Sequence, residues 1–161
     1  MADTIRYIDM LKDILQKQIV VLNAVLVITK EQSKVDSGLN FSDDDFADTL
    51  TKKDALIMRL NELDDGFVSI YNKVRRDVSG NVEQYKNDIK VLQDLIRKCT
   101  DLGMEIQTLE ERNKEKIKRH FENRKQEYSA KQTAANVANK YSVTMRNVNL
   151  MGESYRFNQD K

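Results

Sequence analysis

The sequence has 161 residues with no Pro and only five Gly, which argues against β-sheet and α/β folds, because their hairpins and connecting loops depend on these turn residues. Charged residues make up 33% of the chain and aromatic residues 7%, a balance that favours long amphipathic helices over a compact globule. The net charge of +1 gives no general attraction to nucleic acid, and the single Cys99 excludes an internal disulfide framework.

The first predicted element is a helix over about residues 4–34, with Asp3 or Thr4 as its N-cap. Apolar residues recur in it every three or four positions, which is the spacing of one helix face. They are Ile8, Leu11, Leu15, Ile19, Leu22 and Leu26.

A turn-rich segment separates this helix from a second one, predicted over about residues 43–78. Ser42 or Asp43 suits its N-cap, and the carboxylates of Asp43, Asp44 and Asp45 suit the positive end of its dipole. Its apolar face includes Phe46, Leu50, Ile57, Leu60, Leu63, Phe67, Ile70 and Val74. Gly80 is the predicted left-handed cap that ends it.

The third predicted helix covers about residues 82–139, because no stop signal interrupts this stretch. Its apolar stripe is dense from Tyr85 to Leu109 and then thins, so we expect the second half to protrude or to pair with another chain. The sequence thus predicts an all-α fold over residues 1–139. The arrangement is an antiparallel long-helix hairpin or up-down-up bundle with an extended third helix.

Residues 140–161 are predicted to form a C-terminal tail that is flexible or folds on a partner. From Ala130 the composition turns to Ala, Asn, Ser, Thr and Gln, which hold a helix weakly, but apolar and aromatic residues persist that a solvated tail lacks. A docked last helix and a segment ordered by a partner both stay open. The candidate partner-binding residues are Tyr128, Val137, Tyr141, Met145, Val148, Leu150, Met151, Tyr155 and Phe157.

No pattern of catalytic or metal-binding residues is present in the sequence. His120 is the only histidine, lacks the following Gly of a phosphotransfer domain, and is expected on the solvated surface. Cys99 lies on the apolar stripe and is expected to be buried as a small hydrophobic residue. The acidic pairs Asp64–Asp65 and Glu110–Glu111 are expected on charged helix faces. We therefore predict a protein that is not an enzyme and needs no cofactor or metal.

The location predicted from the sequence is cytoplasmic. The N-terminus has no pattern of a secretory signal, and the most apolar run, Ile19–Ile28, is shorter than the about 20 residues that span a bilayer. We accordingly expect no membrane insertion, and protein partners rather than nucleic acid.

The order of these parts resembles the FlgN family of cytoplasmic export chaperones of the bacterial flagellum, and the resemblance covers most of the chain. The opening helix has a Leu-rich stripe with internal Gln16 and Gln18. An acidic cap then precedes a helix with Phe46, Leu50, Lys53, Leu56, Leu60 and Leu63. A polar tail with scattered Tyr, Met and Phe closes as Ser154–Lys161.

The resemblance implies a chaperone for type III export that keeps the hook–filament junction proteins, of the FlgK and FlgL type, unassembled before export. It also implies that the C-terminal portion binds the client and that an exposed Tyr contacts the export gate. Tyr128, Tyr141 and Tyr155 are the candidates for that contact.

The alternative function is a structural coiled-coil scaffold or adaptor that self-associates through its third helix. The chaperone hypothesis expects a monomer or weak homodimer, whereas the scaffold hypothesis expects an obligate dimer through residues 82–139.

Overall fold

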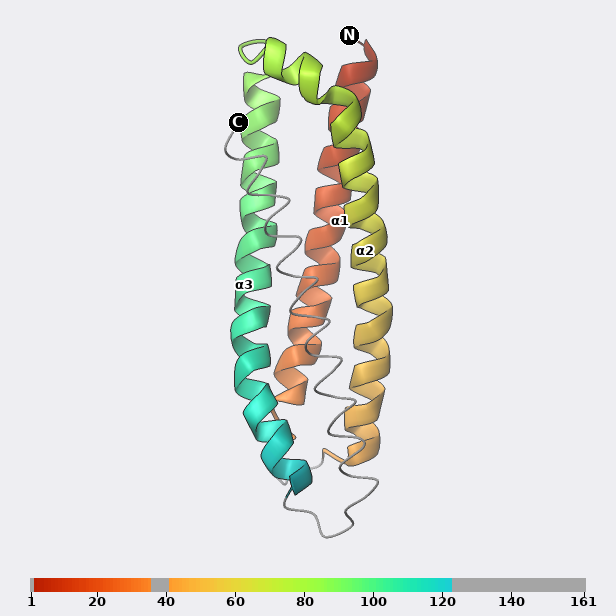
Figure 1. Cartoon of the computed structure of the whole chain (residues 1–161), viewed down its shortest axis with the longest axis vertical. Helices are drawn as coiled ribbons and strands as arrows, with labels where there is room; N and C mark the ends of the chain where they lie inside the picture. The colour runs from red at the N-terminus through yellow and green to blue at the C-terminus, as the bar shows by residue number, and fades with distance from the viewer. Residues whose placement is uncertain (1, 36–40, 123–161) are drawn as a thin grey trace.

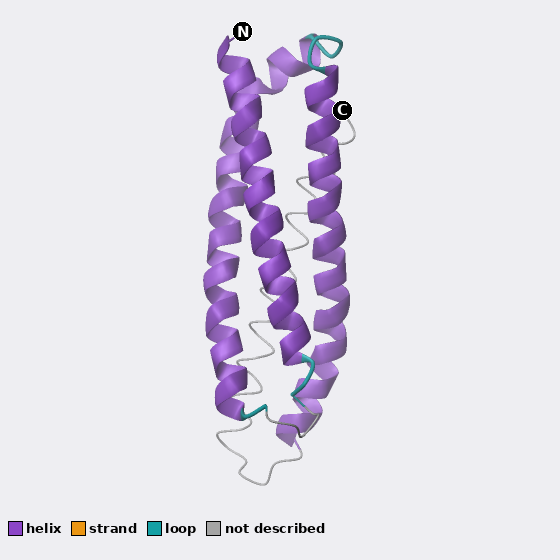
Figure 2. Ribbon diagram, turned by 180° about the vertical axis from the view of Figure 1, so that it is seen from behind, coloured by secondary structure: helices purple, strands orange, loops and turns teal. Residues whose placement is uncertain are grey.

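The computed structural model describes residues 2–35 and 41–122, which form three long helices. These are α1 (Ala2–Gln32), α2 (Asp43–Gly80) and α3 (Lys86–Glu122). They run antiparallel in chain order (Figure 1), and the view from behind shows the same arrangement (Figure 2). The predicted all-α, up-down-up bundle is therefore confirmed. The end of the predicted third helix and the tail lie outside the described residues.

Helix α1 is the central element of the bundle. It packs against both α2 and α3, whereas within the described residues no Cα atom of α2 lies within 8 Å of a Cα atom of α3. Figure 1 shows α2 and α3 on opposite sides of α1. Because α1 faces two neighbours, it needs a wider apolar surface than either of them.

The core is built from the predicted apolar stripes. Leu11, Leu15 and Leu22 of α1 are at most 1% exposed, and burial of such a side chain stabilises the fold by roughly 1.5–3 kcal/mol. They join a continuous cluster with residues of α2 and α3. Its other members include Ile19, Leu60, Phe67, Val74, Ile96, Cys99 and Ile106.

The start of α2 is fixed by a capping box. The Ser42 hydroxyl accepts a hydrogen bond from the Asp45 amide at 3.1 Å, and the Asp45 carboxylate accepts one from the Ser42 amide at 3.0 Å. Two of the otherwise unpaired amides of the first turn are thereby satisfied. The predicted cap at Ser42 is confirmed.

The expectation that the second half of the third helix protrudes is wrong as far as Glu122. Ile117 and Phe121 are 2% and 6% exposed and pack against Val35 and Phe46 in a second apolar cluster. The rings of Phe46 and Phe121 lie edge to face with centroids 5.9 Å apart. The start of α2 supplies an apolar surface for the last turns of α3.

The prediction of a left-handed cap at Gly80 and a helix start at Val82 is also wrong. Gly80 is the last residue of α2, and the cap is Asn81, with φ −137° and ψ 47°, whose amide donates to the Val78 carbonyl. A turn then leads to α3, which begins at Lys86.

Hydrogen bonds to Asp77 hold this turn in place. Its carboxylate accepts hydrogen bonds from the Thr4 hydroxyl at 2.5 Å, the Asn81 amide group at 3.1 Å and the Tyr85 hydroxyl at 3.3 Å. The bond from Thr4 is the main reason that the pKa of Asp77 lies below its usual value. Tyr85 is only 2% exposed, so one carboxylate ties α1, α2 and the start of α3 together.

Candidate functional site

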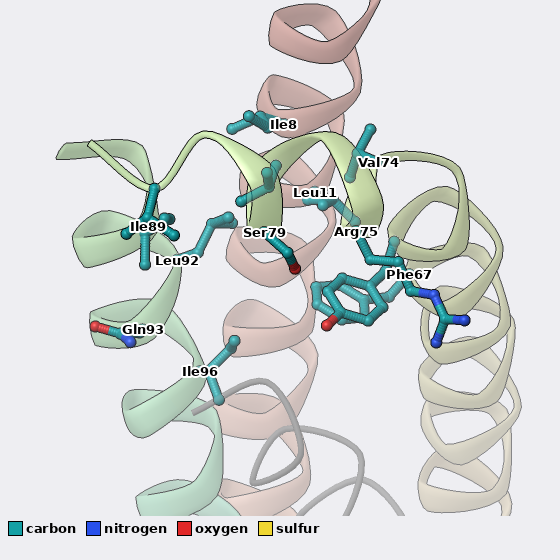
Figure 3. Close-up of a pocket in the computed structure, with 13 residues that line it drawn as sticks. Ile8, Leu11, Phe67, Val74, Arg75, Ser79, Ile89, Leu92, Gln93 and Ile96 are labelled. Carbon is teal, nitrogen blue, oxygen red and sulfur yellow. The ribbon is translucent and has the colours of Figure 1, made fainter. Parts of the chain in front are cut away.

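A pocket lies between the three helices, at the end of the bundle where the chain passes from α2 to α3 (Figure 3). Figure 1 shows the last turns of α2 leaning over α1 towards the start of α3. The pocket therefore draws its lining from all three helices. Its apolar lining includes Ile8 and Leu11 of α1, Phe67 and Val74 of α2, and Leu92 and Ile96 of α3.

The size and chemistry of the pocket suit side chains of another helix. Its volume is about 80 Å³, whereas cofactor and drug-sized ligands need roughly 300–1,000 Å³. The residues of its lining with polar groups are Tyr71, Arg75, Ser79 and Gln93, and Val82 is 49% exposed beside them. An apolar pocket of this size accepts one or two large side chains.

A layer of buried polar residues crosses the bundle nearer its other end. Lys53 of α2 and Glu110 of α3 form an ion pair there, with side chains 4% and 0% exposed. The Lys53 ammonium also donates to the Gln32 side-chain oxygen at 2.9 Å, and the Gln32 amide group donates to the Thr49 hydroxyl at 3.1 Å. This polar layer consists of Thr29, Gln32, Thr49, Lys53, Glu110 and Asn113.

Hydrogen bonds to α1 complete the polar layer. The Asn113 amide group donates to the Thr29 carbonyl at 2.8 Å, and the Thr29 hydroxyl lies 3.4 Å from the Glu110 carboxylate. Glu110 Oε2 and Asn113 Oδ1 have no hydrogen-bond partner among the described residues. Such unpaired buried acceptors are costly, so the layer is less than fully satisfied.

Burial shifts the pKa of both members of the ion pair. Loss of water raises the pKa of Glu110 to about 7, although the Lys53 charge and the bond from Thr29 oppose the shift. Loss of water also lowers the pKa of Lys53, against the opposing effect of Glu110. Neither residue lines the pocket. The pair therefore links α2 to α3 away from the pocket.

The sequence analysis missed this layer, because it placed Glu110 on a charged helix face and gave Lys53 no structural role. The spacing of residues along α3 nevertheless indicates that Glu110 is buried. Glu110 and Asn113 continue the buried series Cys99, Gly103 and Ile106 of α3 at alternating intervals of four and three residues. A charged residue in phase with a buried stripe is a candidate for a core ion pair.

The predictions for the other residues considered in the sequence are confirmed only in part. Cys99 is 0% exposed, as predicted, and burial raises its pKa to about 12. His120 is not fully solvated, because its ring stacks edge to face on Phe121 and Nε2 lies 3.3 Å from the Asp43 carboxylate. Asp64 is half-buried, and burial, followed by the charge of Asp65, raises its pKa.

The nine candidate partner-binding residues, from Tyr128 to Phe157, all lie outside the described residues. In residues 2–35 and 41–122 no group of three His, Cys, Asp or Glu side chains is placed to hold a metal ion. None of the three helices has an apolar stretch long enough to cross a membrane.

Comparison with known proteins found no match to this chain. No protein-family model matches it, and neither the curated proteins nor the solved structures contain a match.

Proposed function

We propose that this protein is a cytoplasmic export chaperone of the FlgN type. It binds a helical segment of flagellar hook–filament junction proteins, of the FlgK and FlgL type, and keeps them unassembled before type III export. The observation that carries the proposal is the pocket between the helices. Its apolar lining and volume of about 80 Å³ suit the side chains of a further helix.

The geometry of helix recognition supports this role. A helix that docks on other helices presents apolar residues at intervals of three or four positions. Val137, Tyr141, Met145 and Val148 keep this interval in the tail, and we propose that this stripe, with its neighbours from Tyr128 to Phe157, contacts the client. Met is adaptable enough to serve more than one client. One of Tyr128, Tyr141 and Tyr155 then contacts the export gate.

The test is binding of a purified hook-associated protein to the full chain, measured by titration calorimetry. Met145→Asp places a charge in the stripe and is expected to weaken binding on the order of tenfold, since a charge cannot enter an apolar contact unpaired. Val20→Asp is the control, because Val20 is 69% exposed on α1 and away from the pocket lining. Failure of the unaltered chain to bind any such protein would refute the proposal.

A further inference from the structure

Arg75 is the only charged residue among the described residues that line the pocket. It belongs to a stripe on α2 and the following turn whose members recur every three or four positions and so share one face. Figure 3 shows the Arg75 side chain beside Phe67, on the side of the pocket away from Leu92 and Ile96. Arg75 is exposed, so a partner that fills the pocket meets a positive charge at its edge. The stripe consists of Phe67, Tyr71, Val74, Arg75, Val78, Ser79 and Val82.

The charge of Arg75 is not paired within the described part of the chain. No ion pair or hydrogen bond joins it to another described residue. Its charge lies close enough to Tyr71 to oppose the rise that burial causes in the pKa of that hydroxyl. The carboxylates near the pocket have other partners, because Asp88 pairs with Lys12 at 2.6 Å and Asp77 holds the turn after α2. Arg75 therefore keeps its charge for an external partner.

We propose that the client segment carries a carboxylate next to its apolar anchor, and that Arg75 pairs with this carboxylate at the edge of the pocket. One large apolar side chain of the client helix enters the pocket. A Glu or Asp three or four positions away on the same face of that helix forms the ion pair. This assignment rests on the proposed function, because it specifies the chemistry of the client that the pocket selects.

The size of the pocket and the geometry of a helix favour this spacing. A volume of about 80 Å³ holds only one or two side chains, so the next side chain on the same face of the client lies outside it. Residues three or four apart on a helix have Cβ atoms roughly 5–6 Å apart. A carboxylate at that distance from the anchor lies at the edge of the pocket, where the long Arg75 side chain reaches it. A guanidinium binds a carboxylate through two parallel hydrogen bonds.

The charge at the edge gives the pocket a selectivity that its apolar lining lacks. Any amphipathic helix offers a large apolar side chain, so the lining alone accepts many of them. A Lys or Arg next to the anchor would meet the like charge of Arg75, which disfavours that segment. Arg75 is thus a specificity-determining residue for acidic client segments.

The first experiment measures binding of a purified hook-associated protein to the full chain by titration calorimetry, with Arg75→Glu and Arg76→Glu as matched variants. Both positions are exposed on α2 and both substitutions change the net charge equally, but only Arg75 lines the pocket. Arg75→Glu is expected to weaken binding about tenfold, because repulsion replaces attraction. Arg76→Glu is expected to change binding by less than about twofold, as is usual for a solvated surface charge. Circular dichroism verifies that both variants are folded.

The outcomes separate this assignment from the proposed function. Equal binding by the two variants and the unaltered chain would overturn the role of Arg75 and leave the chaperone function standing. Equal weakening by both variants would reveal a general effect of net charge and would also overturn it. Self-association that Arg75→Glu alone abolishes, with client binding unchanged, would assign the pocket to a second copy of the chain. Failure of the unaltered chain to bind would refute the chaperone function itself.

A second experiment identifies the carboxylate of the client. Each Asp and Glu in the helical segments of the hook-associated protein is replaced in turn by Lys, and each client variant is titrated into the unaltered chain and into Arg75→Glu. One client variant is expected to bind the unaltered chain about tenfold more weakly and to regain most of this loss with Arg75→Glu, because the reversed charges pair again. If Arg75→Glu rescued none of the client variants, a direct ion pair would be excluded.

Discussion

On folding, the charged groups of Lys53 and Glu110 lose their contacts with water. They gain contacts with each other and with the neighbouring polar groups of α1 and α2. Removal of one member leaves the other charge buried without its partner, which typically costs about 3–5 kcal/mol. The net contribution of the intact pair is smaller, because both charges have already lost their hydration. An apolar pair of similar volume therefore replaces it at little cost.

We predict that Lys53→Met lowers the free energy of unfolding by about 3–5 kcal/mol and that adding Glu110→Leu restores most of the loss. Urea denaturation followed by circular dichroism measures both values. If the double variant were no more stable than Lys53→Met alone, the loss would come from packing around Lys53 and not from the unpaired Glu110 carboxylate.

The raised pKa of Glu110 predicts how stability depends on pH. Its pKa is about 7 in the folded protein and about 4.3 in an unfolded chain, so between these values the folded state binds more protons. The free energy of unfolding therefore falls as pH rises through this window. The Lys53 shift acts in the opposite direction, in the window that lies below the ordinary Lys pKa.

Comparison of the unaltered chain with Glu110→Gln isolates this effect, because the half-buried Asp64 contributes a slope of the same sign in both proteins. Urea denaturation at pH 5 and pH 7 is expected to show a smaller loss of stability in Glu110→Gln. The same slope in both proteins would mean that Glu110 does not titrate in this range.

At the level of the helix, Gly66 lies within α2 although no contact requires a glycine there. A Cβ atom at this position would meet Ile14 Cδ1 at 3.8 Å, an ordinary packing distance. Gly66→Ala is therefore expected to raise the free energy of unfolding by roughly 0.5–1 kcal/mol through helix propensity alone. Thermal unfolding measures the gain, and Ala55→Gly, at an exposed position of the same helix, is expected to lower stability by a similar amount.

The helices and their buried faces were predictable because helix periodicity is a local property of the sequence. Leu11, Leu15 and Leu22 are buried where their spacing placed them, and the cap at Ser42 follows from its own turn. The start of α3 was not predictable in this way. It depends on Asp77, which Thr4 reaches from 73 positions away. A cap fixed by tertiary hydrogen bonds has no local signature.

The candidate site was less predictable than the helices, because a stripe shows that a helix is buried but not against which neighbour. Leu92 and Ile96 were expected on a buried face, yet nothing in their spacing shows that they line a pocket shared with Ile8 and Phe67. Lys53 was given no structural role, since its partner Glu110 is 57 positions away.

On the scale of the whole molecule, the proposed function predicts that the pocket takes part in client binding. Val82 lies in the pocket lining and is 49% exposed. Val82→Asp is therefore expected to weaken binding of a hook-associated protein on the order of tenfold, because a charge at the edge of the pocket opposes apolar docking. Unchanged binding in the calorimetric titration would show that the client does not contact the pocket.

The oligomeric state separates the chaperone from the self-associating scaffold. The proposed chaperone function expects sedimentation equilibrium to show a monomer or a weak homodimer. An obligate dimer would support the scaffold, in which helix surfaces of two copies pair.

The order of synthesis matters because the backbone of α3 approaches that of α1 closely but not that of α2. The α1–α2 hairpin is complete when Gly80 has left the ribosome, but α1 then still presents the face that Ile96, Cys99 and Ile106 will cover. Closing it requires a contact such as that between Cys99 and Leu15, 84 positions apart, and such long-range closures slow folding. The nascent chain thus exposes an apolar strip of α1 while a whole further helix is translated. Transiently exposed apolar surface of this kind is what general folding chaperones protect.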